Sequence, residues 1–195
     1  MNVFVLCTGR SGSTAFHRAC LHITNYTAAH EGKTSEVGEA RFSYPDRHIE
    51  VDNRLSWLLG RLDEAFGDGA FYVHLIRDVD HTSSSFHKRW AGRYSIIRAY
   101  GEGVLRRGDQ SEEISRDYCH TVNANISHFL KDKSKTMTFR LEEASSRFPE
   151  FWERIGAEGD VEGAVGEFDV RHNPSAAPRA RAYARSVWRS RSWFR

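Results

Sequence analysis

A run of six residues near the N-terminus has a pattern suited to binding an anion. The sequence Gly-Arg-Ser-Gly-Ser-Thr at residues 9–14 directly follows the apolar residues 3–7. The apolar residues predict a short buried strand, the glycines a tight turn, and the hydroxyl residues the start of a helix. Such a turn aims several backbone N–H groups at one point, where the helix N-terminus adds partial positive charge. Together with the planar guanidinium of Arg10, the loop is predicted to bind a phosphate or a sulfate.

The loop lacks the lysine that defines a P-loop. A P-loop has the pattern G-x-x-x-x-G-K-[ST], in which the lysine contacts the transferring phosphates. Here Ser13 follows Gly12 in the place of that lysine. A nucleotide kinase or NTPase with a degenerate loop is therefore the alternative enzyme class. A non-catalytic nucleotide-binding protein is a third interpretation.

A second candidate anion site follows the strongest predicted strand. Residues 71–76, Phe-Tyr-Val-His-Leu-Ile, are rich in aromatic and β-branched side chains. Arg77 ends this strand, and Ser85 lies eight residues later, early in a predicted helix. From these positions both side chains can reach one anion. The alternative is that Arg77 pairs with Asp78 or Asp80 and that the serines only cap the helix.

The elements that must position these residues alternate between strand and helix. Strands are predicted at residues 2–7, 26–29, 48–51, 71–76 and 136–140. Helices are predicted at residues 13–22, 53–66, 82–100, 109–130 and 148–155, the fourth opened by a capping box at 109–112. Residues 30–45 are predicted to form a loop and residues 156–178 a turn-rich segment. This alternation indicates an α/β fold with three α/β/α layers around a mainly parallel sheet, similar to P-loop NTPases.

Three polar segments each follow a predicted strand. They are residues 9–14, the pair His30-Glu31 and the pair Arg77-Asp78. The carboxyl ends of parallel strands meet at one edge of the sheet, and ligands of such sheets bind there. The three segments are therefore expected to lie together.

Taken together, the two anion motifs resemble those of the sulfotransferases that use 3′-phosphoadenosine 5′-phosphosulfate. In that family the loop after the first strand binds the 5′-phosphosulfate, and an arginine at a later strand end, with a serine eight residues on, holds the 3′-phosphate. A weaker third motif, a late strand followed by an acidic pair, is matched by residues 138–143. The resemblance covers about residues 2–155.

The resemblance implies transfer of a sulfuryl group to an acceptor hydroxyl or amine, with adenosine 3′,5′-bisphosphate (PAP) as the leaving product and no metal. The nucleotide-binding residues that it implies are Arg10, Ser11, Gly12, Ser13, Thr14, Arg77 and Ser85. Arg10 is also expected to neutralise charge on the bridging oxygen in the transition state. Glu31 is the predicted general base, because several relatives carry an acidic residue after the second strand. His30 is the alternative base, since histidine exchanges protons near neutral pH.

The chain departs from the family near the nucleotide. Ala15 stands where some members carry a tryptophan that stacks on the adenine, so Trp90 and Trp188 are the candidates for that role. Val79 stands where a proline usually follows the Arg-Asp pair. The family's late basic loop, which reaches the 3′-phosphate, is matched by residues 171–173, Arg-His-Asn.

Composition favours one globular domain. The chain has 195 residues, of which 39% are hydrophobic and 28% charged. No apolar run approaches the ~20 residues of a membrane span, and no basic leader precedes the first strand, so a cytoplasmic location is expected. The three cysteines and ten histidines lack zinc or disulfide spacing, so no metal is expected.

Positive charge is concentrated at the C-terminus. The net charge is +2, but residues 171–195 contain seven arginines and no acidic residue. An α/β domain is therefore predicted over residues 1–178 and a basic helix or tail over 179–195. Such a tail suits a polyanionic partner or a membrane surface, although a solvated helix end is the simpler interpretation. No module typical of nucleic-acid binding is present, so the expected partners are the nucleotide and an acceptor, a small molecule or carbohydrate, held by residues 32–45 and 101–110.

Overall fold

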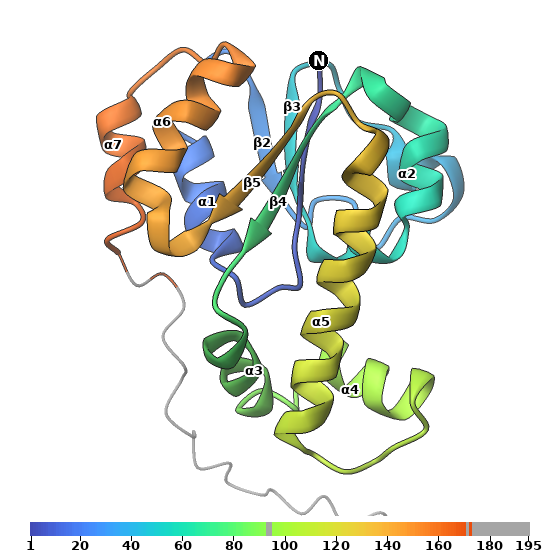
Figure 1. Ribbon diagram of the computed structural model, residues 1–195. Coiled ribbons are helices and arrows are strands. Elements are labelled where there is room, and N and C mark those ends of the chain that lie inside the picture. Colours follow the sequence, from blue (N-terminus) through green and yellow to red (C-terminus); the bar gives the residue numbers. More distant parts are fainter. Residues whose placement is uncertain (93–94, 171, 173–195) are drawn as a thin grey trace, which may run out of the picture.

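Five short strands form the central sheet of the protein (Figure 1). The computed structural model describes residues 1–92, 95–170 and 172. The strands are β1 (Val3–Leu6), β2 (Thr27–His30), β3 (His48–Val51), β4 (Phe71–Ile76) and β5 (Thr136–Arg140). They lie in the order β2-β3-β1-β4-β5, and every neighbouring pair is parallel. The predicted parallel sheet is confirmed, with β1 at its centre.

The central strand β1 is buried on both of its faces. Val3 and Val5 pack into one hydrophobic core, whereas Phe4 and Leu6 pack into the other. Successive side chains of a strand point to opposite faces of the sheet. A strand at the middle of three layers is therefore apolar at every position, which explains the continuous apolar run at residues 3–7.

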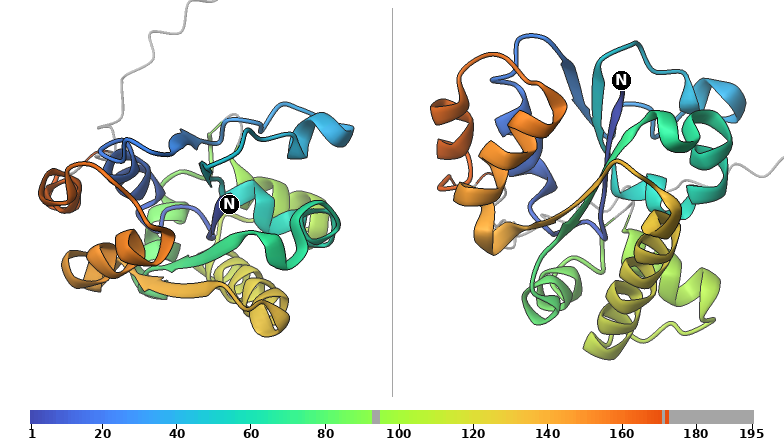
Figure 2. Two further views of the ribbon diagram at one scale, coloured as in Figure 1. Left: turned by 90° about the horizontal axis from the view of Figure 1, so that it is seen from above. Right: turned by 45° about the horizontal axis from the view of Figure 1, so that its top comes forward.

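Helices cover both faces of the sheet (Figure 2). The helices α1 (Ser13–Cys20), α6 (Ala144–Ile155) and α7 (Val161–Gly166) lie on one face. The helices α2 (Leu59–Phe66) and α5 (Glu112–Phe129) lie on the other. The helix α3 (Val79–His87) and the short α4 (Ile96–Arg98) lie beyond the carboxyl end of β4. The predicted α/β/α layering is confirmed.

The helix predicted at residues 53–66 consists of two separate elements. A 3₁₀ helix spans Asn53–Trp57, and α2 begins only at Leu59. The Asp52 carboxylate accepts a hydrogen bond from the Arg54 backbone N–H at 2.8 Å, and the Ser56 hydroxyl donates to the Cys7 carbonyl at 3.0 Å. These bonds connect the 3₁₀ helix to the residue that follows β1. The apolar residues of the two elements therefore do not lie on one continuous α-helix.

The helix predicted at residues 82–100 is also divided. Its first part, α3, begins at Val79 because the Asp78 carboxylate accepts from the His81 backbone N–H at 2.9 Å. It ends at His87, and Ser95 then caps α4, which continues as a π-helical turn over Ala99–Val104. The cap at Ser95 therefore begins a new helix, separate from α3.

Three other local predictions were wrong. The capping box does not form: Ser111 caps α5 by accepting from the Ile114 backbone N–H at 3.3 Å, while Asp109 pairs with Arg107. The segment predicted to be turn-rich contains α7, which Asp160 caps. The predicted loop at 30–45 contains a 3₁₀ helix at Gly38–Phe42.

The C-terminal predictions fall outside the described residues. These are the basic helix or tail at 179–195, the domain boundary before it, and Trp188. Across the part of the chain that is described, no helix has the length and apolar character required to cross a membrane.

Candidate functional site

The loop after β1 turns sharply before α1 begins. Gly9, Arg10 and Gly12 have φ values of 81°, 58° and 92°, in the left-handed region. Glycine takes such values without strain, whereas an arginine does so at a cost. The Gly12 carbonyl accepts the first helical hydrogen bond, from Phe16 at 3.0 Å. The first N–H groups of α1 therefore point toward the loop, as an anion site requires.

Gly12 has no room for a side chain. A Cβ there would lie 2.5 Å from Cδ1 of Leu141. We expect Gly12→Ala to lower the free energy of unfolding by about 2–4 kcal/mol, of which about 1 kcal/mol is left-handed strain and the rest overpacking. Urea denaturation measures the loss. Gly156→Ala is the matched control, because Gly156 has a φ of 63° and a Cβ added there would have no atom within 4 Å; equal losses in the two variants would contradict the contact.

The second anion motif meets the first. Nε of Arg10 donates to the Ser85 hydroxyl on α3 at 3.0 Å. Nη1 of Arg77, which directly follows β4, donates to the carbonyl of Arg10 at 3.4 Å. Asp80 pairs with Arg116, and Asp78 caps α3. The two motifs predicted from the sequence are therefore one cluster, joined through Arg10.

The third motif closes the same cluster from the side of β5. Glu142 Oε1 accepts from the Asp78 backbone N–H at 3.0 Å, which links the acidic pair to the residue after Arg77. Leu141 packs on Gly12, because its Cδ1 atom would lie 2.5 Å from a Cβ atom added to Gly12. All three motifs of the sequence thus converge at the carboxyl edge of the sheet.

Positive charge is crowded around Arg10. Burial lowers the pKa of Arg10 below its ordinary value, and the nearby charges of Arg89 and Arg77 lower it further. A guanidinium remains protonated at neutral pH despite such a shift. An anion bound here would offset the repulsion among these cations, so the cluster favours a group with more than one negative charge.

The cluster lines a cavity of about 500 Å³, a size typical of ligand sites. The predicted site residues on its wall are Arg10, Gly12, Ser13, Thr14, Arg77 and Ser85. Ser11 does not line the cavity. It is buried beside Cys7, whose thiol pKa burial raises to about 11.

Sequence reasoning missed four polar residues of the cavity wall, namely Asp169 and three residues of α3 and its C-terminal end. His81, Ser84 and Lys88 line it together with Ser85, from α3 and its C-terminal end. Their spacing of three and four residues places them on one helix face. In the sequence, this spacing was the signal that could have identified them as wall residues. His172, from the predicted late basic loop, also lines the cavity.

One wall of the cavity is apolar. Leu141, Phe168 and Val170 form it. The Phe168 ring lies 5.8 Å from the Phe139 ring and nearly parallel to it, so the core holds it in place. Trp90 does not line the cavity, because it is buried in the core on the other side of the sheet. Trp90, one of the two candidates for stacking on the adenine, therefore does not lie at this cavity in the structure.

Glu31 and His30 lie beside the loop rather than on the cavity wall. His30 Nε2 is 3.1 Å from the Ser13 hydroxyl at the start of α1. Glu31 has a φ of 57°, and its carboxylate forms an ion pair with Nη1 of Arg54 at 2.6 Å. The Glu31 side chain remains 34% exposed, so its carboxylate stays accessible to a second molecule.

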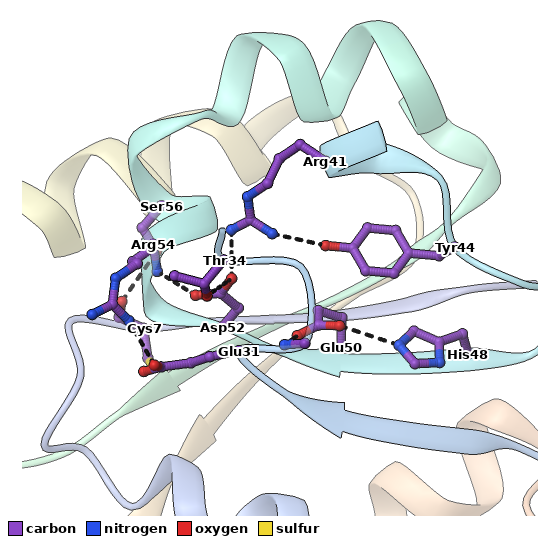
Figure 3. A network of polar contacts seen from close by, with 11 residues as sticks. Cys7, Glu31, Thr34, Arg41, Tyr44, His48, Glu50, Asp52, Arg54 and Ser56 are labelled. Carbon is purple, nitrogen blue, oxygen red and sulfur yellow. Dashed lines mark hydrogen bonds and ion pairs between the residues drawn. The ribbon is translucent and has the colours of Figure 1, made fainter. Parts of the chain in front are cut away.

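Two buried carboxylates bind the backbone next to the Glu31–Arg54 pair (Figure 3). Glu50 accepts from the Gly32 backbone N–H at 2.8 Å, and Asp52 accepts from the Arg54 backbone N–H at 2.8 Å. Both carboxylates are fully buried. Each has a charged or polar partner, His48 for Glu50 at 3.2 Å and Arg41 for Asp52 at 2.5 Å. Sequence reasoning missed this network, although acidic residues at alternate positions of a buried strand were visible.

No group of three or more histidine, cysteine or acidic residues suited to a metal ion is present in the described residues. Apart from Asp169, the polar side chains of the cavity wall carry guanidinium, ammonium, imidazole and hydroxyl groups. Of these, the guanidinium and ammonium groups bind anions rather than cations.

Comparisons with known proteins support the fold. Neither a protein-family model nor a curated protein matches the sequence. Among solved structures, the chain is similar to mouse sulfotransferase SULT7A1 complexed with PAP, with a TM-score of 0.53 and 8% sequence identity. The match covers 86% of this chain and 62% of that protein. The chain therefore has an α/β fold with a parallel five-stranded sheet, and this fold is similar to that of the sulfotransferase.

Proposed function

We propose that this chain is a sulfotransferase that moves a sulfuryl group from 3′-phosphoadenosine 5′-phosphosulfate to an acceptor hydroxyl or amine. The observation that carries the proposal is the contact between Arg10 and Ser85, because it joins two anion motifs, distant in sequence, at one cavity. Likeness in fold to a sulfotransferase complexed with PAP adds support.

The cavity suits the two ends of this nucleotide. In our proposal, the loop at residues 9–14 binds the 5′-phosphosulfate through backbone N–H groups and Arg10. Arg77 and Ser85 bind the 3′-phosphate, and Lys88 adds positive charge at that end. The adenine lies against the apolar wall at Phe168 and Leu141. This wall takes the role of the tryptophan that some sulfotransferases carry at the position of Ala15.

The chemistry requires positioning and charge stabilisation from the protein. The acceptor atom forms a new bond to sulfur, and the bond between sulfur and the bridging oxygen of the 5′-phosphate breaks. Glu31 takes the proton of the acceptor. Arg10 and the loop amides neutralise the charge that develops on the bridging oxygen, and PAP leaves with the bonding electron pair.

Nucleotide binding tests the proposal. By calorimetry in EDTA, we expect the protein to bind PAP at least tenfold more tightly than adenosine 5′-monophosphate, because a charge-assisted contact contributes about 1.5–3 kcal/mol. Arg77→Ala should lose this preference. Arg18→Ala, which removes an exposed arginine of α1, should keep it.

Two results would contradict the proposal. One is binding of ATP with magnesium in the absence of PAP binding, which favours the kinase or NTPase alternative. The other is an unchanged preference for PAP in Arg77→Ala, which removes the assignment of the 3′-phosphate site.

A further inference from the structure

A second cavity, of about 380 Å³, has Arg54 of the Glu31–Arg54 pair on its wall. The segment at residues 34–41, the 3₁₀ helix Asn53–Trp57 with the start of α2, and Ile96 of α4 form its walls. It shares no lining residue with the nucleotide cavity. The two linings are therefore distinct, although Asn53, on the same 3₁₀ helix as the wall residues Arg54 and Trp57, lies against Gly9 of the anion loop.

The walls of this cavity are largely apolar. They include Val37, Trp57, Leu58 and Ile96. Val37 is 82% exposed and Trp57 is 38% exposed, which is unusual for side chains of this kind. Leaving apolar area in water is unfavourable by about 25 cal/mol for each Å². These side chains therefore gain free energy when an apolar molecule covers them.

Trp57 is held rigidly rather than left loose. Its ring centroid lies 6.1 Å from those of Tyr100 and Tyr118. The Tyr118 hydroxyl in turn donates to the carbonyl of Thr8 at 2.8 Å, directly before the anion loop. A rigid aromatic wall binds a ligand without a large loss of side-chain entropy. The exposed indole is thus an ordered apolar surface, and Tyr118 connects it to the start of the nucleotide loop.

The cations that line this cavity already have partners in the protein. Arg41 is buried and pairs with Asp52, and Arg54 pairs with Glu31. Arg61 lies over the Phe42 ring at 4.7 Å and pairs with Glu39 at 3.5 Å. Glu36 also lines the cavity and forms no ion pair in the described residues, so the cations of the wall are balanced and one negative charge remains. A neutral ligand complements such a wall better than a phosphate or an acidic sugar.

The cavity adjoins the group assigned as the general base. Arg54 is both a wall residue of the cavity and the partner of the Glu31 carboxylate at 2.6 Å. The residue before it, Asn53, packs on Gly9 of the anion loop, with Nδ2 3.0 Å from a Cβ position there. The cavity wall therefore includes the ion-pair partner of Glu31 and belongs to the same 3₁₀ helix as the residue that packs on the anion loop.

We propose that this cavity holds the acceptor, and that the acceptor is a neutral alcohol with a compact apolar or aromatic body. The inference rests on the sulfotransferase function proposed above. The hydroxyl oxygen of the acceptor forms the new bond to sulfur, its proton passes to Glu31, and PAP is the leaving group. This excludes an acidic sugar polymer, which the arginine-rich C-terminus would have favoured.

Direct binding tests the inference without depending on turnover. The probe is 2-naphthalenemethanol, titrated by calorimetry into the protein with PAP present, and the polar comparison is N-acetylglucosamine. We expect only the aromatic alcohol to bind, and we expect Val37→Ser to weaken it about tenfold. Val37 is exposed, so this variant should fold normally. Leu21→Ser is the matched control, because Leu21 is 51% exposed and lies outside the cavity.

The outcomes separate the two proposals. Absence of aromatic alcohol binding, or equal binding by Val37→Ser and the unaltered protein, overturns the acceptor assignment. Sulfuryl transfer to N-acetylglucosamine and not to the aromatic alcohol also overturns it, while the sulfotransferase function stands. Failure to bind PAP, with the aromatic alcohol still bound at Val37, refutes the sulfotransferase function and leaves the cavity as a site for apolar molecules.

Discussion

Replacing Arg10 by alanine is expected to lower kcat/KM for sulfuryl transfer by about a thousandfold, the size of effect seen when a transition-state donor is removed. Arg10 contacts Ser85 through Nε and lines the cavity. Its half-buried position and the neighbouring cations strengthen its interaction with an anion. Initial rates with saturating acceptor measure the loss.

Two further variants make the Arg10 result specific. Arg10→Lys keeps the charge but loses the fork of donors, so we expect an intermediate loss. Arg18→Ala removes an exposed arginine from the adjacent helix and should leave the rate unchanged. PAP binding should weaken much less than kcat/KM, because the transition state carries the additional charge. Equal losses in PAP affinity and in kcat/KM would show that Arg10 contributes only to binding.

Glu31→Gln is the second change with a large expected effect. Removing a general base lowers the rate by about 10²–10⁴-fold. The glutamine can still contact Arg54, so the loop after β2 should keep its shape, and PAP affinity should be unchanged. The measurement is therefore a pair: turnover by a labelled sulfuryl donor, and PAP binding by calorimetry.

The controls for Glu31 distinguish it from its neighbour. Glu64→Gln changes an exposed carboxylate of α2 and should have full activity. If Glu31→Gln retains full activity, the base assignment moves to His30, which contacts Ser13 at 3.1 Å. His30→Asn would then be the inactive variant.

The sequence predicts the sheet and the tight turn after β1 well because both depend on local patterns. The apolar run at residues 3–7 and the glycines after it determine a buried strand and a tight turn by themselves. Arg77 and Ser85 are likewise separated by a fixed strand-to-helix turn. Their contact with Arg10 follows once β1 and β4 are neighbours, as the pairing of Val3 with Phe71 shows.

What the sequence does not predict depends on contacts between distant segments. The Glu31–Arg54 pair exists because β2 and β3 are adjacent, with His30 opposite Val51. The helix α7 has two glycines in six residues, so its intrinsic propensity is low. It forms because Ala164 is fully buried against the core. Packing, rather than periodicity, decides these elements.

The central place of β1 has a consequence for how the protein matures. We expect the anion loop to reach its native shape after β4 and α3 have been synthesised, since the Arg10 carbonyl accepts from the Arg77 guanidinium and Arg10 Nε donates to the Ser85 hydroxyl. A nucleotide that binds only the native state raises the free energy of unfolding by about 2.7 kcal/mol at a hundred times its Kd. The nucleotide would therefore stabilise the native state after folding and would not initiate folding.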